Sequence, residues 1–276
     1  MKIIACTPTK NRRWAWEWSQ TCMDLQKLQP DVWFVLDNST SPDEDWSVSK
    51  VHPKVRYEHV EGEKPVAWLR NRCIDVALEE QADYLIFWDD DDYYPPTRIS
   101  TGVAALEANP DADISGSSKM YLLLVRENVL MTTGPFGDTH ATAATHTIRR
   151  RYFEANRFDP TDVRGEERAF TKDWSAKLVQ VPAEDMIVVM GHGRNTVDKS
   201  DLAVNPTRYR ATIVNGDNGK MMFRARWPVP WDRWRSTFSD VIRGRLPGST
   251  LSVESQTAIV PTLRTEAPAK SDERRA

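Results

Sequence analysis

Short apolar runs alternate with stretches of helical periodicity along the first part of the chain. Residues 2–6, 31–37 and 84–88 are mostly apolar and lead into polar or acidic residues, which predicts buried strands. Between them, apolar side chains recur every three or four positions in residues 14–28 and 65–80, which predicts amphipathic helices. The chain therefore begins with repeated strand and helix units.

Strands that alternate with helices form a mostly parallel sheet with helices on both faces. Residues 55–60 add a strand of alternating polarity, and residues 97–108 add a helix. Ligands of such sheets bind outside the carboxyl ends of the strands. We therefore predict a Rossmann-like α/β fold in which Thr7, Asp37 and Asp89 meet at one crevice.

The pattern is less regular further along. Residues 113–125 are predicted to form more sheet, residues 134–147 an irregular loop and residues 165–177 a helix. Short strands are expected at residues 178–181 and 186–190. We place all of these elements in one catalytic domain.

Two regions follow this catalytic domain of residues 1–200. Residues 201–246 form an extension in which Arg and Trp interleave, and residues 247–276 are rich in Ser, Thr, Pro and charge, which predicts a disordered tail. Interleaved Arg and Trp suit stacking on bases, binding of a glycan or contact with a lipid surface. The alternative is a helix that docks through its tryptophans and leaves its arginines in water.

Charge and cysteine usage exclude some classes of protein. The net charge is −3 and the pI is near 6.0, so the whole chain has no signature of a nucleic-acid or anionic-membrane binder. Its three cysteines lack CxxC spacing, which predicts reduced thiols. No apolar run approaches the roughly 20 residues of a spanning helix, and the apolar start is too short for a signal peptide, so we expect a cytoplasmic protein.

Four consecutive aspartates, Asp89 to Asp92, follow the apolar strand at residues 84–88. Their mutual repulsion is relieved by a hard cation such as Mg²⁺ or Mn²⁺, which takes carboxylate and phosphate oxygens and so suits a diphosphate leaving group. The alternative is a hydrated turn before the next helix. The polar ends of the two other strands favour the metal site.

Several segments resemble, in order, those of the GT-A fold, inverting family 2 glycosyltransferases. YLIFWDDDDYYPP resembles the YIAFLDADD-type segment, IIACTPTKNR the opening strand with its PTYNR-like turn, VWFVLDNSTSPD the VVDDGSTD segment, and LRNRCIDVA the ARNxGIxxA helix. The resemblance implies a metal-dependent enzyme that moves a sugar from a nucleoside diphosphate sugar, in first place a UDP-sugar, to an acceptor hydroxyl.

Carried over position by position, the resemblance assigns contacts with the nucleoside. Thr7, Pro8 and Thr9 would border the nucleoside, and Asp37, together with Asn38, would contact the base. Thr9 and Asn38 are also ordinary turn formers, so a purely structural role is the alternative for both. Asp37 is the firmest of these assignments.

The resemblance also assigns the diphosphate and metal contacts. Arg70 would lie near the base or the diphosphate, although an arginine on a helix can also form a surface ion pair. Asp89 and Asp91 match the two aspartates of the DxD motif, and Asp91 is the favoured metal ligand. Asp90 replaces a usually small residue. His192 matches a position near the metal or diphosphate, against the alternative of a structural histidine.

Inverting transfer needs a base near the acceptor hydroxyl. RGEERAF resembles the acidic ED-type motif of the family, which favours Glu167 as the base, with Glu166 as the other candidate. Both glutamates could instead complement the positive end of a helix dipole. By the same resemblance, His146 would lie near the donor sugar or the acceptor.

Two other functions compete with this interpretation. A sugar-phosphate nucleotidyltransferase normally has a Gly-rich basic loop after its first strand, and TPTKNRR has no glycine. A non-enzymatic module for glycans or nucleic acid would not need the acidic run. The sequence leaves the acceptor open between a glycan, a lipid carrier, a protein and a modified nucleic-acid base.

Overall fold

The computed structural model describes most of the predicted catalytic domain and short pieces beyond it. The described residues are 1–42, 54–126, 128–162, 165–195, 207, 210–214, 229, 231–239 and 243. The predicted tail at residues 247–276 lies outside them, as does most of the extension. No described helix is long and apolar enough to span a bilayer.

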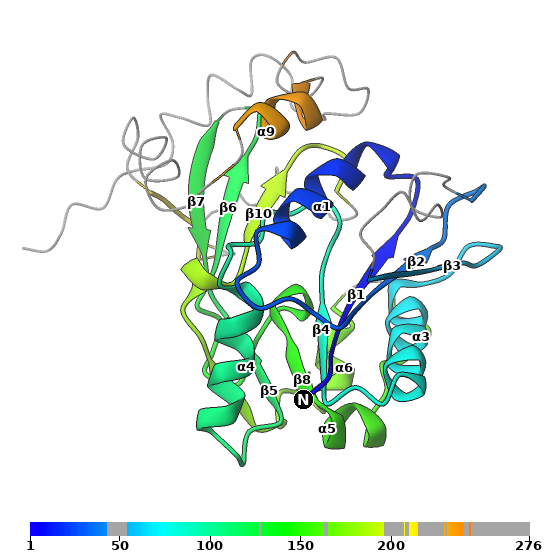
Figure 1. Cartoon of the computed structure of the whole chain (residues 1–276). Coiled ribbons are helices and arrows are strands. Elements are labelled where there is room, and N and C mark those ends of the chain that lie inside the picture. The colour runs from blue at the N-terminus through cyan, green and yellow to red at the C-terminus, as the bar shows by residue number, and fades with distance from the viewer. Residues whose placement is uncertain are drawn as a thin grey trace, which may run out of the picture.

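A seven-stranded sheet forms the centre of the molecule (Figure 1). Its strands are, in spatial order, β3 (Val55–His59), β2 (Val32–Asp37), β1 (Ile3–Thr9), β4 (Tyr84–Phe87), β8 (Thr147–Arg149), β5 (Ile114–Gly116) and β9 (Leu178–Gln180). Neighbours pair in parallel except that β8 runs antiparallel to both β4 and β5. The predicted α/β fold with a mostly parallel sheet is confirmed.

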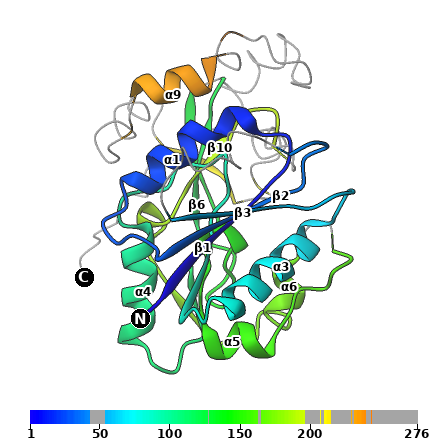
Figure 2. The same cartoon turned by 45° about the vertical axis from the view of Figure 1, so that its right-hand side comes forward.

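Both faces of this sheet are buried because apolar residues run continuously along its central strands. Ile3 and Ala5 of β1 point into one core with α1 (Trp16–Asp24) and α4 (Arg98–Ala108), and Ile4 and Cys6 point into another. The second core is closed by two helices, α3 (Val66–Glu79) and α5 (Arg150–Ala155). Figure 2 shows these helices around the strands. Successive side chains of β1 therefore pack alternately into the two cores, one on each face of the sheet.

A second, four-stranded sheet lies beside the first (Figure 1). Its order is β10 (Val188–Gly191), β6 (Met120–Leu124), β7 (Val129–Thr133) and β11 (Thr212–Ile213). β10 and β6 are parallel, and the other pairs are antiparallel. Strand β11 comes from the predicted extension and pairs with β7, while α9 (Trp231–Thr237) packs on α1.

The predicted helix at residues 165–177 is mostly wrong. The helix α6 contains only Glu167–Phe170, and the backbone then turns through three residues with left-handed φ, Lys172 (53°), Asp173 (55°) and Trp174 (64°). Residues other than glycine rarely adopt this backbone conformation, so helical periodicity in the sequence could not have predicted it. The short elements left are η1 (Arg13–Ala15), η2 (Ala143–Thr145) and η3 (Ala183–Asp185).

Candidate active site

The aspartates after β4 have different partners, and Asp92 has a structural one. Its Oδ1 accepts a hydrogen bond from the Met190 amide at 2.8 Å, and its carbonyl oxygen accepts one from the Trp18 indole at 2.9 Å. Met190 belongs to β10 and Trp18 to α1. Asp92 therefore joins the end of β4 to the second sheet and to α1.

Arg12 lies against Asp90 and Asp91. Its Nη1 is 2.7 Å from Asp90 Oδ1 and 2.8 Å from Asp91 Oδ2. Asp90 is fully buried and accepts a further hydrogen bond from the Thr9 hydroxyl at 2.5 Å. Burial raises the pKa of Asp90 to about 6 although Arg12 opposes the rise. Burial alone would lower the pKa of Arg12, but Asp90 and Asp91 outweigh it and raise that pKa.

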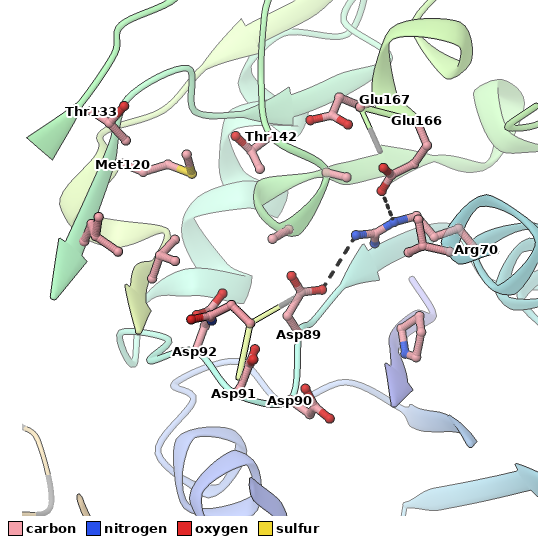
Figure 3. A pocket seen from close by; sticks show the side chains of 18 of the residues that line it. Arg70, Asp89, Asp90, Asp91, Asp92, Met120, Thr133, Thr142, Glu166 and Glu167 are labelled. Atoms are coloured by element: carbon pink, nitrogen blue, oxygen red, sulfur yellow. Dashed lines mark hydrogen bonds and ion pairs between the residues drawn. The ribbon is translucent and has the colours of Figure 1, made fainter. Parts of the chain in front are cut away.

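Arg70, in α3, links Asp89 to Glu166 (Figure 3). Its Nε donates to Glu166 Oε1 at 2.8 Å, and its Nη2 lies 3.7 Å from Asp89 Oδ1. The guanidinium also stacks 4.6 Å from the centre of the Phe87 ring. Arg70 is 5% exposed, and its buried Nη1 has no hydrogen-bond partner among the described residues. A buried donor without a partner is costly, so an acceptor atom at this point would stabilise the site.

A cavity of about 320 Å³ joins these groups to the two glutamates (Figure 3). Its polar wall contains all four aspartates, both arginines and both glutamates. The remaining wall is mostly apolar or small and is formed by Pro8, Val66, Met120, Leu122, Thr133, Thr142, Ala143, Ala144, Gly165, Val189 and Asn195. A cavity is therefore present at the strand ends, and it extends towards the second sheet. Of Thr7, Asp37 and Asp89, which were predicted to meet there, only Asp89 lines it, because Thr7 and Asp37 are buried and hydrogen-bonded within the fold.

The two glutamates differ in their partners. The Glu166 carboxylate is buried and forms the ion pair with Arg70. The Glu167 carboxylate lines the same cavity and forms no ion pair with any described residue. Burial raises the pKa of Glu167 to about 7, and the negative charge of Glu166 adds to the rise. A carboxylate with a pKa near neutrality suits a general base, so Glu167 is the better candidate of the two.

His192 follows β10 and lies next to Asp91. Its Nε2 is 2.9 Å from Asp91 Oδ2, and its Nδ1 accepts a hydrogen bond from the Arg194 amide at 3.1 Å. The Arg194 amide favours the tautomer with the ring proton on Nε2, directed at Asp91, and Asn195 Nδ2 also lies 3.2 Å from Nε2. The ring of Trp14 packs edge-on against His192, with centroids 4.9 Å apart.

The helix α9 closes this aromatic cluster from outside. The ring of Phe238, just after α9, is fully buried, 5.9 Å from the His192 ring and 5.8 Å from the Trp14 ring. Trp234 is buried, whereas Arg233 and Arg235 are exposed, and Arg233 pairs with a glutamate of α1. This part of the predicted extension therefore docks through its aromatic rings with its arginines in water.

Most residues predicted to contact the nucleoside are engaged within the fold. Pro8 lines the cavity, but Thr7 is buried and accepts a hydrogen bond from the Trp33 indole at 2.9 Å. Asp37 is fully buried, and its carboxylate accepts hydrogen bonds from the Ser39 amide and the Tyr57 hydroxyl. Thr9, as described, binds Asp90. These residues shape the strand ends, and their contact with a nucleoside stays a prediction.

Asn38 and His146 also lie outside the cavity lining. The Asn38 side chain donates to the carbonyls of Val60 and Gly62 and accepts from the Lys64 amide, so it holds the loop after β3. His146 is fully buried, and burial lowers its pKa to about 3. The neighbouring Ala143 and Ala144, rather than His146, face the cavity.

Arg12 is the residue that the sequence-based interpretation missed. It stands in the TPTKNRR loop after β1, and a parallel sheet brings this loop beside the run after β4. A basic side chain in one strand-end loop and four acids in the next were visible in the sequence. What could not be read there was the side-chain direction, since Asn11 bends the loop with a left-handed φ of 54°.

Comparisons with known proteins agree with this fold. The model of the family described as Glycosyl transferase family 2 matches residues 5–171. The structure of S. aureus TarS 1–349 with UDP has a TM-score of 0.52 at 16% identity, covering 69% of this chain and 60% of its own. The mannosyltransferase PcManGT from Pyrobaculum calidifontis, with GDP-Man and Mn²⁺, has a TM-score of 0.51 at 12% identity, covering 94% and 74%. The structure of TarS 1–349 with UDP-GlcNAc has a TM-score of 0.51 at 15% identity, and the match covers 95% of this chain and 79% of the TarS chain. No curated protein matches the chain.

The fold and the strand-end cavity thus define a protein of the GT-A class. The family match covers more than half of the sequence, and the chain belongs to glycosyl transferase family 2. The predicted family, fold class and enzyme class are confirmed at this level. The chain spans less than two thirds of the TarS structure bound to UDP.

Proposed function

We propose that this chain transfers a sugar from a nucleoside diphosphate sugar to an acceptor hydroxyl, with inversion at the anomeric carbon. A UDP-sugar is the favoured donor. The observation that carries the proposal is one cavity that holds both a carboxylate with a pKa near 7, Glu167, and two arginines, Arg12 and Arg70. The carboxylate suits proton removal, and the arginines suit a diphosphate. Either feature alone would be much less specific.

Glu167 acts as the base in this proposal. As the acceptor oxygen attacks the anomeric carbon, its proton moves to the Glu167 carboxylate, and the bond from that carbon to the diphosphate oxygen breaks. The diphosphate leaves with the bonding electron pair. Because attack and departure take place on opposite faces of the carbon, one such step inverts its configuration. In Figure 3 Glu167 lies across the cavity from Asp90 and Asp91, as this arrangement requires.

Arg70 holds the diphosphate. Its Nε is fixed by Glu166, its plane is fixed by Phe87, and its Nη1 has a hydrogen to donate. A guanidinium fixed in this way is preorganised for phosphate oxygens, and it stabilises the charge that develops as the sugar departs. Glu166 is therefore a positioning residue for Arg70.

The predicted divalent ion fits these residues only in part. Asp91 Oδ2 and His192 Nε2 are 2.9 Å apart, close to the about 3.0 Å expected between neighbouring ligands of an octahedral ion. However, Arg12 already contacts Asp91, the His192 proton points at Asp91, and no three His, Cys, Asp or Glu side chains among the described residues are grouped to hold a metal. We therefore derive no step through Mn²⁺ or Mg²⁺, which remain a prediction.

The acceptor side of the cavity is largely apolar. Met120 and Leu122 of β6, Val189 of β10 and the two alanines of η2 form this wall. It favours an acceptor that presents an apolar face beside its hydroxyl, and the glycan, lipid carrier, protein and modified base all stay open. A cytoplasmic location likewise remains a prediction.

The test is a donor panel. The full chain is incubated with UDP- and GDP-sugars and a mixture of candidate acceptors, and products are read by mass spectrometry. We expect release of one nucleoside diphosphate with one sugar mass added to an acceptor, and thermal stabilisation by that same diphosphate. The proposal fails if no nucleoside diphosphate stabilises the protein and no donor is consumed.

A further inference from the structure

Arg12 lies against the two central aspartates of the acidic run. The loop that carries it is held in place, because the Asn11 amide donates to Ser39 Oγ at 2.7 Å and the Asn11 side chain accepts from the Thr40 amide at 3.2 Å. The Arg12 side chain is 17% exposed and contacts both Asp90 and Asp91. Its position is thus set by backbone contacts as well as by charge.

The charges in the cavity require a resident cation. Asp90 has 0% exposure, and a buried carboxylate without a cation is strongly destabilised. Among the described lining residues, Arg12 and Arg70 are the basic ones, and Arg70 is engaged by Asp89 and Glu166. Arg12 is therefore the group that neutralises Asp90 and Asp91.

His192 supports the same conclusion independently. A histidine that binds a metal usually donates its other ring nitrogen to an acceptor. Here the other nitrogen, Nδ1, accepts from the Arg194 amide, so ligation through Nε2 would cost that hydrogen bond. Arg70, which lines the same cavity, has a buried Nη1 without a partner among the described residues, and an anion rather than a cation would satisfy such a donor.

We propose that Arg12 serves as the built-in cation of the acidic run, so that this enzyme binds its nucleoside diphosphate without a divalent ion. The Asp90 and Asp91 carboxylates both contact Nη1 of the guanidinium, and Nη2 lies 3.4 Å from the Arg194 carbonyl oxygen. Arg12 lines the cavity in which the phosphates would bind, together with Arg70. This inference rests on the proposed function for the identity of the ligand. Its statement about divalent ions is tested separately.

The experiment compares Arg12→Met, Arg12→Lys and Arg13→Met in the full chain. Arg13 is the matched control because it is the exposed neighbour, it does not line the cavity, and its replacement changes the net charge equally. Binding of UDP and GDP is measured by calorimetry in EDTA and in Mn²⁺. Mn²⁺ binding without nucleotide is measured by electron paramagnetic resonance.

We expect wild type and Arg13→Met to bind the nucleoside diphosphate equally well in EDTA and in Mn²⁺. In EDTA, Arg12→Met should bind the nucleoside diphosphate with roughly 10- to 100-fold lower affinity than wild type, as expected for the loss of a charge-assisted hydrogen bond. Mn²⁺ should restore part of this affinity. The same variant should bind free Mn²⁺ at least about tenfold more tightly than wild type, because two carboxylates lose their counter-ion. Arg12→Lys should stay close to wild type.

The inference is overturned if wild type binds the diphosphate only with Mn²⁺, or if Arg12→Met gains no affinity for Mn²⁺. If Arg12→Met does not fold, Arg12→Gln takes its place, because glutamine removes the charge, keeps a hydrogen-bond donor and leaves both carboxylates intact, and the same two outcomes apply to it. Failure of the proposed function looks different. In that case no nucleoside diphosphate binds to any form, while the Mn²⁺ comparison still decides the role of Arg12.

Discussion

Replacement of Glu167 by glutamine should abolish transfer and yet stabilise the protein at high pH. Burial and Glu166 raise the pKa of Glu167 from its ordinary 4.5 to about 7. This rise corresponds to roughly 3 kcal/mol of unfavourable free energy when the folded protein must keep Glu167 ionised. Glutamine has nearly the same shape but no charge, so the variant avoids this cost.

The way this stability difference depends on pH follows from proton binding. Folding favours the protonated form of Glu167, so the cost is absent below about pH 4.5, grows as the pH rises towards 7 and is complete above it. At about pH 8 Glu167→Gln should therefore be more stable than wild type by up to roughly 3 kcal/mol, with partial solvent access reducing the gain. Near pH 4.5 the two proteins should be equally stable.

Urea unfolding at several pH values measures the stability, and mass spectrometry measures transfer. Transfer by wild type should rise with pH through about 7 as the base loses its proton, and the variant should lose roughly 10²- to 10⁴-fold or more. Glu154→Gln is the control, because Glu154 is exposed on α5 and should change neither property. Unchanged turnover in Glu167→Gln, or equal stability of both proteins at high pH, would refute the reasoning.

Three further substitutions test separate parts of the site. Arg70→Met should lower the free energy of unfolding by roughly 3–5 kcal/mol, because it leaves the buried Glu166 carboxylate unpaired. The same variant should no longer bind the diphosphate in calorimetry. A stable variant that still binds the diphosphate would show that Arg70 is not part of the binding site. Phe238→Ala should weaken the packing of α9 on α1 by roughly 3–5 kcal/mol and should make α9 sensitive to protease. Equal cleavage of wild type and variant would contradict this packing. Asp92→Asn should lower the urea midpoint while leaving affinity for the diphosphate within about twofold, since it loses a charged acceptor for the Met190 amide; a large loss of affinity at unchanged stability would instead give Asp92 a binding role.

The first half of the fold could be predicted because its strands are continuously apolar and its helices amphipathic. The predicted ranges 31–37 and 65–80 match β2 and α3 to within a residue or two. No strand was predicted for β7 or β8, which are short and run antiparallel to their neighbours, so that their pairing depends on distant segments. Three left-handed residues ended α6 where periodicity predicted a longer helix.

The candidate site shows the same division. The location of Asp89 and Asp91 at one cavity could be expected, since strand ends of a parallel sheet converge, whereas Glu167, in α6, was expected there only from the resemblance to the family motif. Which carboxylate meets which cation could not be expected, because that depends on side-chain directions. The sequence distinguished Asp89 and Asp91 by their match to the DxD motif, but it did not predict that Arg70 lies near Asp89, that Asp90 and Asp91 share Arg12, or that Asp92 accepts from the Met190 amide.

The docking of α9 bears on how this protein should be divided for laboratory work. Phe238 forms the outer side of the pocket that holds the His192 ring, which in turn contacts Asp91. A shortened version that stopped at the predicted boundary of residue 200 would leave Trp14 and Trp18 facing water. Ligand screens on such a fragment would sample an aromatic surface that the longer polypeptide covers, and any hit there would say little about sugar transfer.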